Sequence, residues 1–341
     1  MHSVSKFQGN FRGMNAPLSL GRIRALRLIA QLLAPSTAFP RTFAMDSAVG
    51  AAKHMLASQA QQRGSALVAL DIRSHKPGTA ATALETSLLI RSWSQRGTHQ
   101  ILAAEDVRWM TLLCSPRIVA ASAKRRHQLG LDDAAVHRAH EVLSEHAAIA
   151  PVPRSQAYEL FRSVDVDPGE HRGQHLLRHF GGEGNIVQGP PVDNEDTFVL
   201  LDSICPLSLG LRGDEALFEM TRRYFYSRGA ATIKDVQWWS GLTLRDLRKG
   251  VAFLAGRGEI VQVAGPNKEE MWIPAWAESV TSEEVASALE PELTLPAFDE
   301  YLLSYTDRTH LMDSEHLFSI GPGKNGVFKP FKVVQGEALP V

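Results

Sequence analysis

The most unusual polar residues of this sequence are two glutamines separated by one alanine, Gln59 and Gln61. The spacing of apolar residues predicts a helix over residues 46–61. Its inward positions are Val49, Ala52, Leu56 and then Gln59. A half-buried amide costs about 1–3 kcal/mol unless it is hydrogen-bonded. The amide is therefore either a structural bracket, which the residues alone favour, or a group that a polar ligand reaches.

Two further groups of polar side chains could bind anions. Arg245, Arg248 and Lys249 share the outer face of a predicted helix whose inner face is apolar, and such a face either contacts phosphate or is simply solvated. His171, His175 and His179 recur every four residues on another predicted helix. Zinc would need further ligands, so no metal site is predicted, and we interpret these histidines, with Arg172 and Arg178, as a stripe that contacts phosphate.

Other catalytic signatures are missing from the sequence. The carboxylates Asp299, Glu300 and Asp307 form no nucleophilic triad, and an ion pair between Asp307 and Arg308 explains the last of them. The sequence has no phosphate-binding loop, no dinucleotide fingerprint and no zinc protease motif, so no cofactor is expected.

Composition excludes several classes of protein. The 341 residues are 44% hydrophobic and carry a net charge of -1, so any nucleic-acid contact must come from local basic faces. No apolar run is long enough for a membrane span, and Cys114 and Cys205 read as small core residues. Residues 1–45 lack acidic residues, as a transit peptide does, but the spacing of apolar residues over 23–33 favours a core helix. We expect a cytoplasmic, nucleoid-associated protein.

The elements that must position these residues follow one order three times, with two or more amphipathic helices before two strands. This order is typical of a winged helix, whose third helix enters the major groove of DNA. The expected helices are Leu20–Leu33, 46–61, Ala66–Ile72, Thr79–Leu88 with a Thr82/Glu85 capping box, Asp132–His146, Ser155–Val164, His171–Phe180 started by Pro168, one around 217–228, Lys234–Ser240 capped by Thr232, and one around 244–254. The expected strands are Leu89–Ser94, His99–Ala103, Asn185–Gln188, Thr197–Leu201, Glu259–Val263, Glu270–Ile273 and Val327–Val334.

The predicted fold class is therefore α+β, predominantly α, with three tandem winged-helix units. The expected divisions are a tail over 1–15, units over 16–118, 119–209 and 210–285, and a short β-rich segment over 286–341. The turn at Gln335 and Gly336 has no predicted strand after it, so the last segment is expected to be a truncated sheet.

At these residues the sequence resembles the AlkZ/YcaQ-like winged-helix DNA glycosylases. The resemblance covers about Leu18 to Val341, and its specificity lies in the shared order of its segments. The matching segments are Leu56–Gln61, Arg91–Thr98 with Ala104–Asp106, Thr197–Leu201, Trp238–Leu242, Phe298–Leu302 with Tyr305–Arg308, and Asn325–Pro330. The second glutamine of the Gln-x-Gln motif places the chain nearer the AlkZ-like branch than the YcaQ-like branch, which has Asp there.

The resemblance implies that Gln59 and Gln61 form the catalytic pair of a monofunctional glycosylase acting on alkylated purines in duplex DNA. A positively charged base leaves readily, so two amides that orient water against the developing oxocarbenium ion suffice, although neither amide is a general base. The expected DNA contacts are Arg91, Arg96, Arg172, His175, His179, Arg245, Arg248 and Lys249. Family members act as monomers, so one chain is expected to embrace double-stranded DNA.

Two departures from the family pattern accompany the resemblance. Family members often carry a histidine shortly after Arg-Gly-Thr, where this chain has His99 and Gln100. Family sequences also continue into further strands beyond the segment that ends at Pro330, which suggests a truncated or degenerate member. The alternative to an enzyme is a non-catalytic winged-helix DNA-binding protein in which the two amides only bracket the first helices.

Overall fold

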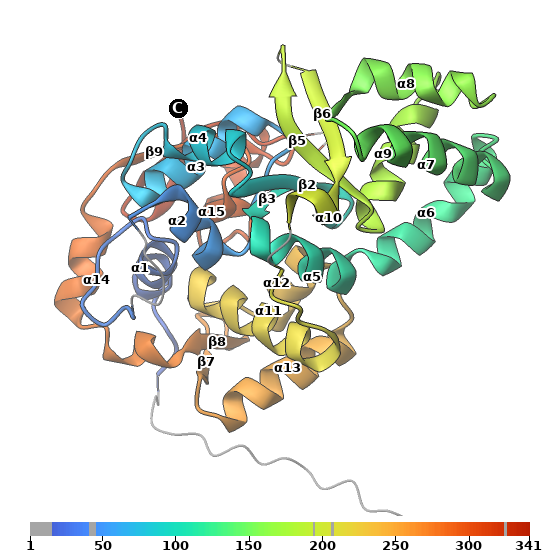
Figure 1. The fold of residues 1–341 in the computed structure, drawn as a ribbon. Coiled ribbons are helices and arrows are strands. Elements are labelled where there is room, and N and C mark those ends of the chain that lie inside the picture. Colours follow the sequence, from blue (N-terminus) through green and yellow to red (C-terminus); the bar gives the residue numbers. More distant parts are fainter. Residues whose placement is uncertain (1–15, 41–45, 194, 206–207, 324–325) are drawn as a thin grey trace, which may run out of the picture.

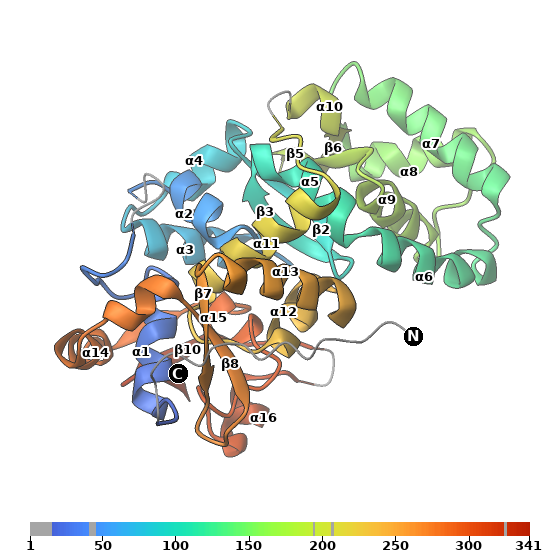
Figure 2. The same ribbon diagram turned by 90° about the horizontal axis from the view of Figure 1, so that it is seen from below.

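The computed structural model describes residues 16–40, 46–193, 195–205, 208–323 and 326–341, so the expected tail over 1–15 lies outside the described residues. The fold is a mostly helical α+β arrangement (Figures 1 and 2). The first elements are α1 (Leu20–Ala30), α2 (Ala48–Met55), β1 (Ser58–Gln59), α3 (Arg63–Ser74), α4 (Thr79–Glu85), β2 (Leu89–Gln95) and β3 (Thr98–Ala103). They are followed by α5 (Ala104–Cys114), α6 (Pro116–Gln128), α7 (Asp133–Ala147), β4 (Val152–Pro153), α8 (Arg154–Ser163), α9 (Arg172–Gly182), β5 (Ile186–Val192), β6 (Glu195–Leu200) and α10 (Leu201–Ile204).

The second half of the chain continues with α11 (Gly213–Arg228), α12 (Ile233–Ser240), α13 (Leu244–Gly256), β7 (Ile260–Ala264), β8 (Glu270–Pro274), the 3-10 helix η1 (Ala275–Ser279) and α14 (Ser282–Leu289). Its last elements are β9 (Leu293–Leu295), α15 (Glu300–Leu303), η2 (Ser314–His316), α16 (Leu317–Ile320), β10 (Phe331–Val334) and β11 (Glu337–Pro340). The predicted alternation of helices and hairpins is therefore present in all three parts of the chain.

The first two hairpins form one continuous sheet. Its strand order is β1-β3-β2-β5-β6-β4, and Arg91 of β2 pairs with Gln188 of β5 where the two hairpins meet (Figure 1). The third hairpin, β7 with β8, is a separate antiparallel sheet, and β11-β10-β9 is a third sheet. The first two expected units therefore share backbone hydrogen bonds across their hairpins.

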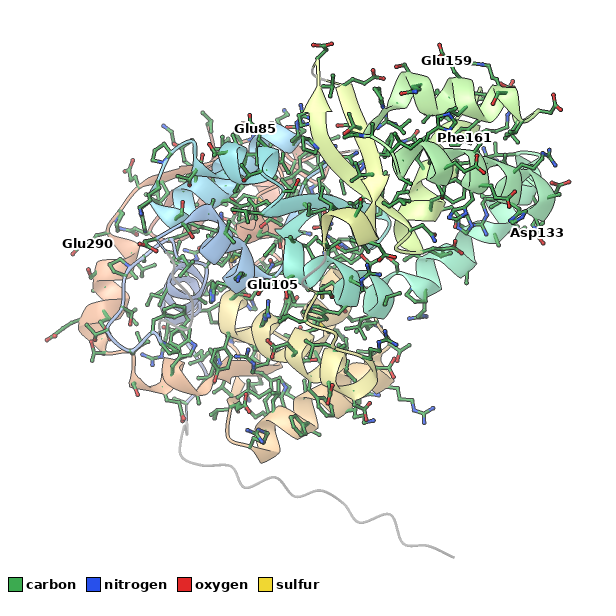
Figure 3. All side chains as sticks on the ribbon, viewed as in Figure 1. Glu85, Glu105, Asp133, Glu159, Phe161 and Glu290 are labelled. Carbon is green, nitrogen blue, oxygen red and sulfur yellow. The ribbon has the colours of Figure 1, made fainter. Side chains whose placement is uncertain are left out.

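Helix α1 lies inside the largest core. Ser19 caps the helix by accepting a hydrogen bond from the backbone of Arg22, and Ile23, Leu26 and Ile29 are at most 1% exposed. Helix α11 packs against α1 and ends at Gly229, whose φ is +65° and where a Cβ atom would lie 2.6 Å from the carbonyl oxygen of Leu26. The prediction that the apolar spacing over 23–33 belongs to a core helix is confirmed by α1. A second core surrounds Phe161 in the part built by α7, α8 and α9 (Figure 3).

The predicted helix over 46–61 is wrong in its second half. Helix α2 ends at Met55, Leu56 has φ +63°, and Gln59 lies on β1, where it pairs with Gln100 of β3. The buried guanidinium of Arg228 donates hydrogen bonds to the carbonyl oxygens of Met55 and Ala57. A distant arginine thus satisfies carbonyls that a longer helix would have bonded internally, and the chain can enter the sheet.

Several predicted boundaries are also wrong. No Thr82 capping box opens α4, because the carboxylate of Asp71 accepts from the backbone N–H groups of Gly78 and Ala80 at the helix start. Pro168 does not start α9, which begins after His171 at φ +69°. The turn at Gln335 and Gly336 is followed by β11, which pairs with β10, so the expectation that no strand follows is wrong. The Thr232 cap of α12 is confirmed and forms a full capping box with Asp235.

Helices α5, α6 and α14 were not predicted. Helix α6 has no buried residue, so it lacks the apolar stripe on which sequence reasoning depends. Both cysteines are buried free thiols, and burial raises the pKa of Cys114 to about 12. Among the described residues, every helix is too short or too polar to cross a membrane.

Candidate functional site

The side chain of Gln59 is held at both ends of its amide. Its oxygen accepts hydrogen bonds from Arg96 (2.9 Å), Gln100 (2.8 Å) and Thr98 (3.3 Å), all from β3 or the turn before it. Its nitrogen donates to the side-chain oxygen of Gln61 at 2.8 Å. Gln59 is 5% exposed, whereas Gln61 is exposed. The buried amide therefore fixes the orientation of the exposed one.

The backbone of Gln59 is fixed by a buried carboxylate from a distant helix. Its N–H donates to Oε1 of Glu300 at 2.9 Å. The other oxygen of Glu300 accepts from Arg228 (3.1 Å), Trp239 Nε1 (3.0 Å) and Ser304 (2.6 Å). Burial opposes ionisation of Glu300, but the charge of Arg228 and the Ser304 hydrogen bond outweigh it and hold the pKa below its usual value.

Arg91 supports the same backbone from the other side. Its Nε donates to the carbonyl of Ala60 at 2.8 Å, and its Nη1 donates to Gln188 at 2.5 Å and to Asp196 at 3.2 Å. The side chain is 7% exposed, so its guanidinium group binds protein groups and has little contact with solvent. Its remaining nitrogen lies 3.2 Å from His99 Nδ1.

His99 is a neutral imidazole in this site. Burial, followed by the charge of Arg91, lowers its pKa to about 3. Its ring lies 4.4 Å from the ring of Trp93, and its Nε2 lies 3.1 Å from the amide nitrogen of Gln188. The histidine therefore carries no charge near neutral pH and serves as a polar link between the two hairpins.

The carboxylate of Asp196 lies beside the glutamines and pairs with three arginines. It forms ion pairs with Arg154 (2.9 Å), Arg91 (3.2 Å) and Arg63 (3.4 Å), which begin α8, lie in β2 and begin α3. The carboxylate is 22% exposed. With three cations around one anion, this edge of the site has an excess of positive charge.

Three more arginines, Arg96, Arg178 and Arg308, lie at or near the turn between β2 and β3. Arg96 and Gly97 both have positive φ, and a Cβ atom on Gly97 would lie 2.8 Å from Cζ of Arg178 on α9. The guanidinium carbon of Arg96 lies 5.8 Å from the ring centre of Trp238, and that of Arg308 lies 5.9 Å from the same ring. Segments from α9, α12 and the chain after α15 therefore meet at this turn.

The structure brings together only some of the predicted site residues. Gln59, Gln61, Arg91 and Arg96 form one site. His175 and His179 line a cavity of about 10 Å³ with Gly97 and Arg178, and burial lowers the pKa of His179 to about 4. Arg172 is paired with Asp167 and Glu170.

The predicted DNA-contacting face of α13 carries Arg245, Arg248 and Lys249. Arg245 and Arg248 are exposed, and within the described part of the chain neither side chain forms a hydrogen bond or an ion pair. Lys249 is paired with Asp214 at 2.6 Å. No cluster of His, Cys, Asp and Glu among the described residues could hold a metal ion.

Sequence reasoning missed the groups that hold the glutamines in place. Gln100, Arg228 and Trp238 were not predicted as site residues, and Glu300 was noted only as a carboxylate without a triad. The separation of Glu300 from Gln59 is 241 residues, and no local pattern reports such a contact. The signal that was present is the set of short segments that carry the family resemblance, since Gln59, Arg96, Trp238, Glu300 and Arg308 all lie within them.

The fold and this site define an α+β, mostly helical protein with a paired-glutamine centre surrounded by arginines. The family described as DNA glycosylase AlkZ-like matches residues 52–339, and the chain belongs to this family. The predicted family resemblance is thereby confirmed. The structure of Streptomyces sahachiroi DNA glycosylase AlkZ is similar, with a TM-score of 0.73 over 95% of this chain and 87% of that chain, at 19% sequence identity, which shows a shared fold. A comparison with curated proteins gave no match.

Proposed function

We propose that this protein binds duplex DNA and hydrolyses the N-glycosidic bond of alkylated purines as a monofunctional glycosylase. The observation that carries the proposal is the hydrogen bond of the Gln59 amide to Gln61, which presents one oriented amide at the surface of an arginine-rich site. Membership of the AlkZ-like DNA glycosylase family supports the reaction class.

The proposed chemistry needs little from the protein beyond orientation. The bond between C1′ and the base nitrogen breaks, and its electron pair neutralises the cationic base, which leaves. The oxygen of a water molecule then bonds to C1′, and the water loses its proton to solvent. Gln61 would hold that water, while Gln59 and Glu300 keep Gln61 in place. The reaction leaves an abasic site, and strand cleavage is not expected because no lysine is assigned as a nucleophile.

The DNA contacts in this proposal come from the arginines around the glutamines and from the outer helices. We assign Arg96 and the partly exposed His175 to DNA contacts beside the glutamines. We assign Arg245, Arg248 and Lys249 to DNA contacts made by α13. The Arg91 side chain is only 7% exposed and is already paired with Asp196, so we assign it a positioning role together with that carboxylate. Arg172 and His179 contribute less, because one is neutralised by carboxylates and the other is uncharged near neutral pH.

The three helix-and-hairpin parts would act as winged helices around one duplex, so a single chain would suffice. We keep the divisions 16–118, 119–209, 210–285 and 286–341 as the proposed units, with the qualification that the first two share a sheet.

A second candidate is a DNA-binding protein without catalysis. It is favoured by one observation, namely that the oxygen of Gln59 already accepts three hydrogen bonds and so behaves as a structural bracket. In that case Gln61 would be a surface residue without chemical consequence.

The deciding experiment is base release from duplex DNA that contains 7-methylguanine, read out as heat-labile abasic sites. Gln61→Ala changes an exposed side chain and should abolish release while duplex binding persists. Gln59→Ala should do the same but also lower stability, because it removes the oxygen that accepts hydrogen bonds from Arg96, Thr98 and Gln100. Gln62→Ala is the matched control, since Gln62 is an exposed neighbouring glutamine. Equal release by the parent protein and Gln61→Ala would contradict the proposed catalytic pair.

A further inference from the structure

Trp238 is an exposed aromatic ring beside the glutamine site. It is 46% exposed, whereas the next residue, Trp239, is fully buried and donates to Glu300. Arg96 and Arg308 approach the Trp238 ring at 5.8 Å and 5.9 Å from its centre. Because Arg96 also donates to Gln59, this aromatic ring is one side chain away from the proposed catalytic pair.

Carboxylates near this ring favour the charged forms of its two guanidinium groups without contacting them, namely Glu300 for Arg96, and Asp235 and Asp307 for Arg308. Within the described residues, neither Arg96 nor Arg308 has a salt bridge to a carboxylate. Arg308 donates to the carbonyl of Leu302, and the Nε of Arg96 is buried without a hydrogen-bond partner. Burial and the charge of Arg96 lower the pKa of Arg308 to about 10, which leaves Arg308 charged at neutral pH.

The carboxylates that pack nearby are committed elsewhere. Asp235 accepts from Thr232 and from the backbone of Thr306, Asp307 accepts from Thr309, and Glu300 pairs with Arg228. A comparable ring elsewhere in the protein shows the contrast. Phe253 also has an arginine beside it, Arg257 at 5.6 Å, but that arginine pairs with Glu259 at 2.6 Å. The arginines beside Trp238 are therefore available to bind an anion, whereas the arginine beside Phe253 is already paired with a carboxylate.

A nucleotide supplies both an anion for the two arginines and a flat ring for the exposed indole. Its phosphate matches the two guanidinium groups, and its base can stack on an exposed indole if it has left the helical stack. The cationic lesion itself is a poor occupant, because two arginine charges would repel it. A neighbouring or opposite nucleotide with an uncharged base, unstacked when a glycosylase opens the duplex, is the better match.

We infer that Arg96, Trp238 and Arg308 form a binding site for a nucleotide whose base is unstacked and uncharged, with its phosphate on the two arginines and its base on the indole. This inference rests on the proposed binding of duplex DNA. It assigns Trp238 and Arg308 as specificity-determining residues, separate from the Gln59 and Gln61 pair.

The test uses the full chain and two duplexes of the same sequence, one fully paired and one with a single bulged adenine, with binding followed by fluorescence anisotropy. The parent should prefer the bulged duplex. Trp238→Ala should weaken binding of the bulged duplex by roughly 5- to 100-fold and change binding of the paired duplex by less than about 2-fold. Trp238→Phe should keep most of the preference, and Phe253→Ala, the matched exposed ring, should keep all of it.

The arginine part of the site has its own readout. Arg308→Gln should reduce the salt dependence of binding to the bulged duplex by about one phosphate contact. An equal loss for both duplexes in Trp238→Ala would overturn the inference alone. If the parent binds neither duplex, both the inference and the proposed function are wrong, whereas failure of base release alone leaves the inference standing.

Discussion

The backbone N–H of Gln59 donates a hydrogen bond to Oε1 of Glu300 at 2.9 Å, although 241 residues separate them. This contact ties the first strand of the large sheet to helix α15. Glu300 in turn contacts Arg228, which also bonds the carbonyl of Ala57. One buried carboxylate therefore links the glutamine motif to the third and last parts of the chain.

Replacing this carboxylate by its uncharged isostere should be strongly destabilising. Glu300→Gln leaves the buried charge of Arg228 without a counterion, and breaking a buried pair costs about 3–5 kcal/mol. We expect that loss in the free energy of unfolding, measured by urea denaturation. Glu290→Gln, at the exposed end of α14 (Figure 3), is the control and should change stability by less than about 0.5 kcal/mol. Similar stabilities of the two variants would contradict this account of Glu300.

Two helical glycines should respond to alanine with opposite signs. At Gly181 of α9 a Cβ atom would lie 2.9 Å from Cζ3 of Trp93, a buried ring that cannot easily move, so Gly181→Ala should destabilise the protein by about 1–3 kcal/mol. At Gly64, in the first turn of α3, a Cβ atom would meet nothing within 4 Å. Gly64→Ala should therefore stabilise by about 0.5–1 kcal/mol, because alanine loses less backbone entropy. Thermal unfolding of both variants tests this, and the same sign for both would refute the packing argument.

Acid should destabilise the protein through His54. Its Nε2 lies 2.6 Å from the carbonyl oxygen of Ala30, and burial lowers its pKa from 6.5 to about 4. Between these two values the unfolded chain binds a proton that the folded chain does not, so stability rises with pH across this window and falls as pH drops from 6.5 to 4. The loss reaches about 3 kcal/mol at pH 4, from a pKa difference of about 2.5.

The measurement is urea denaturation at pH 7 and at pH 4.5. His54→Gln should reduce the difference in stability between the two pH values, although His99, with a pKa of about 3, leaves part of it. His137→Gln serves as the control, because that side chain is 70% exposed. An unchanged pH dependence in His54→Gln would mean that His54 is not the titrating group.

Sequence reasoning predicted most of the elements that have one buried apolar face and one exposed polar face. The helices now seen as α7, α8, α12 and α13 were predicted to within a few residues, and so were the β2–β3 hairpin and the β7–β8 hairpin. It failed where tertiary contacts replace local bonds. The extension of α2 to residue 61 looked favourable by periodicity, but Arg228 takes the carbonyls of Met55 and Ala57.

For the site, the residue types were predicted and their surroundings were not. The Gln-x-Gln motif and the turn arginine Arg96 could be selected from the sequence because an amide on an apolar face and a matching segment are local features. The buried state of Arg91 could not, since its partners Gln188 and Asp196 come from the neighbouring hairpin. Nor could the pairing of Arg172 and Lys249 with carboxylates, which removes much of their charge.

The sequence by itself determined the family, the helix and hairpin order and the identity of the paired glutamines, because these depend on residue type and short-range spacing. Only the tertiary structure decided that Gln59 lies on a strand, that two hairpins join in one sheet, and that Arg96 and Arg308 both approach the ring of Trp238. The physical reason is that buried polar groups must find partners, and here those partners lie on elements far away in the chain, where no local pattern records them.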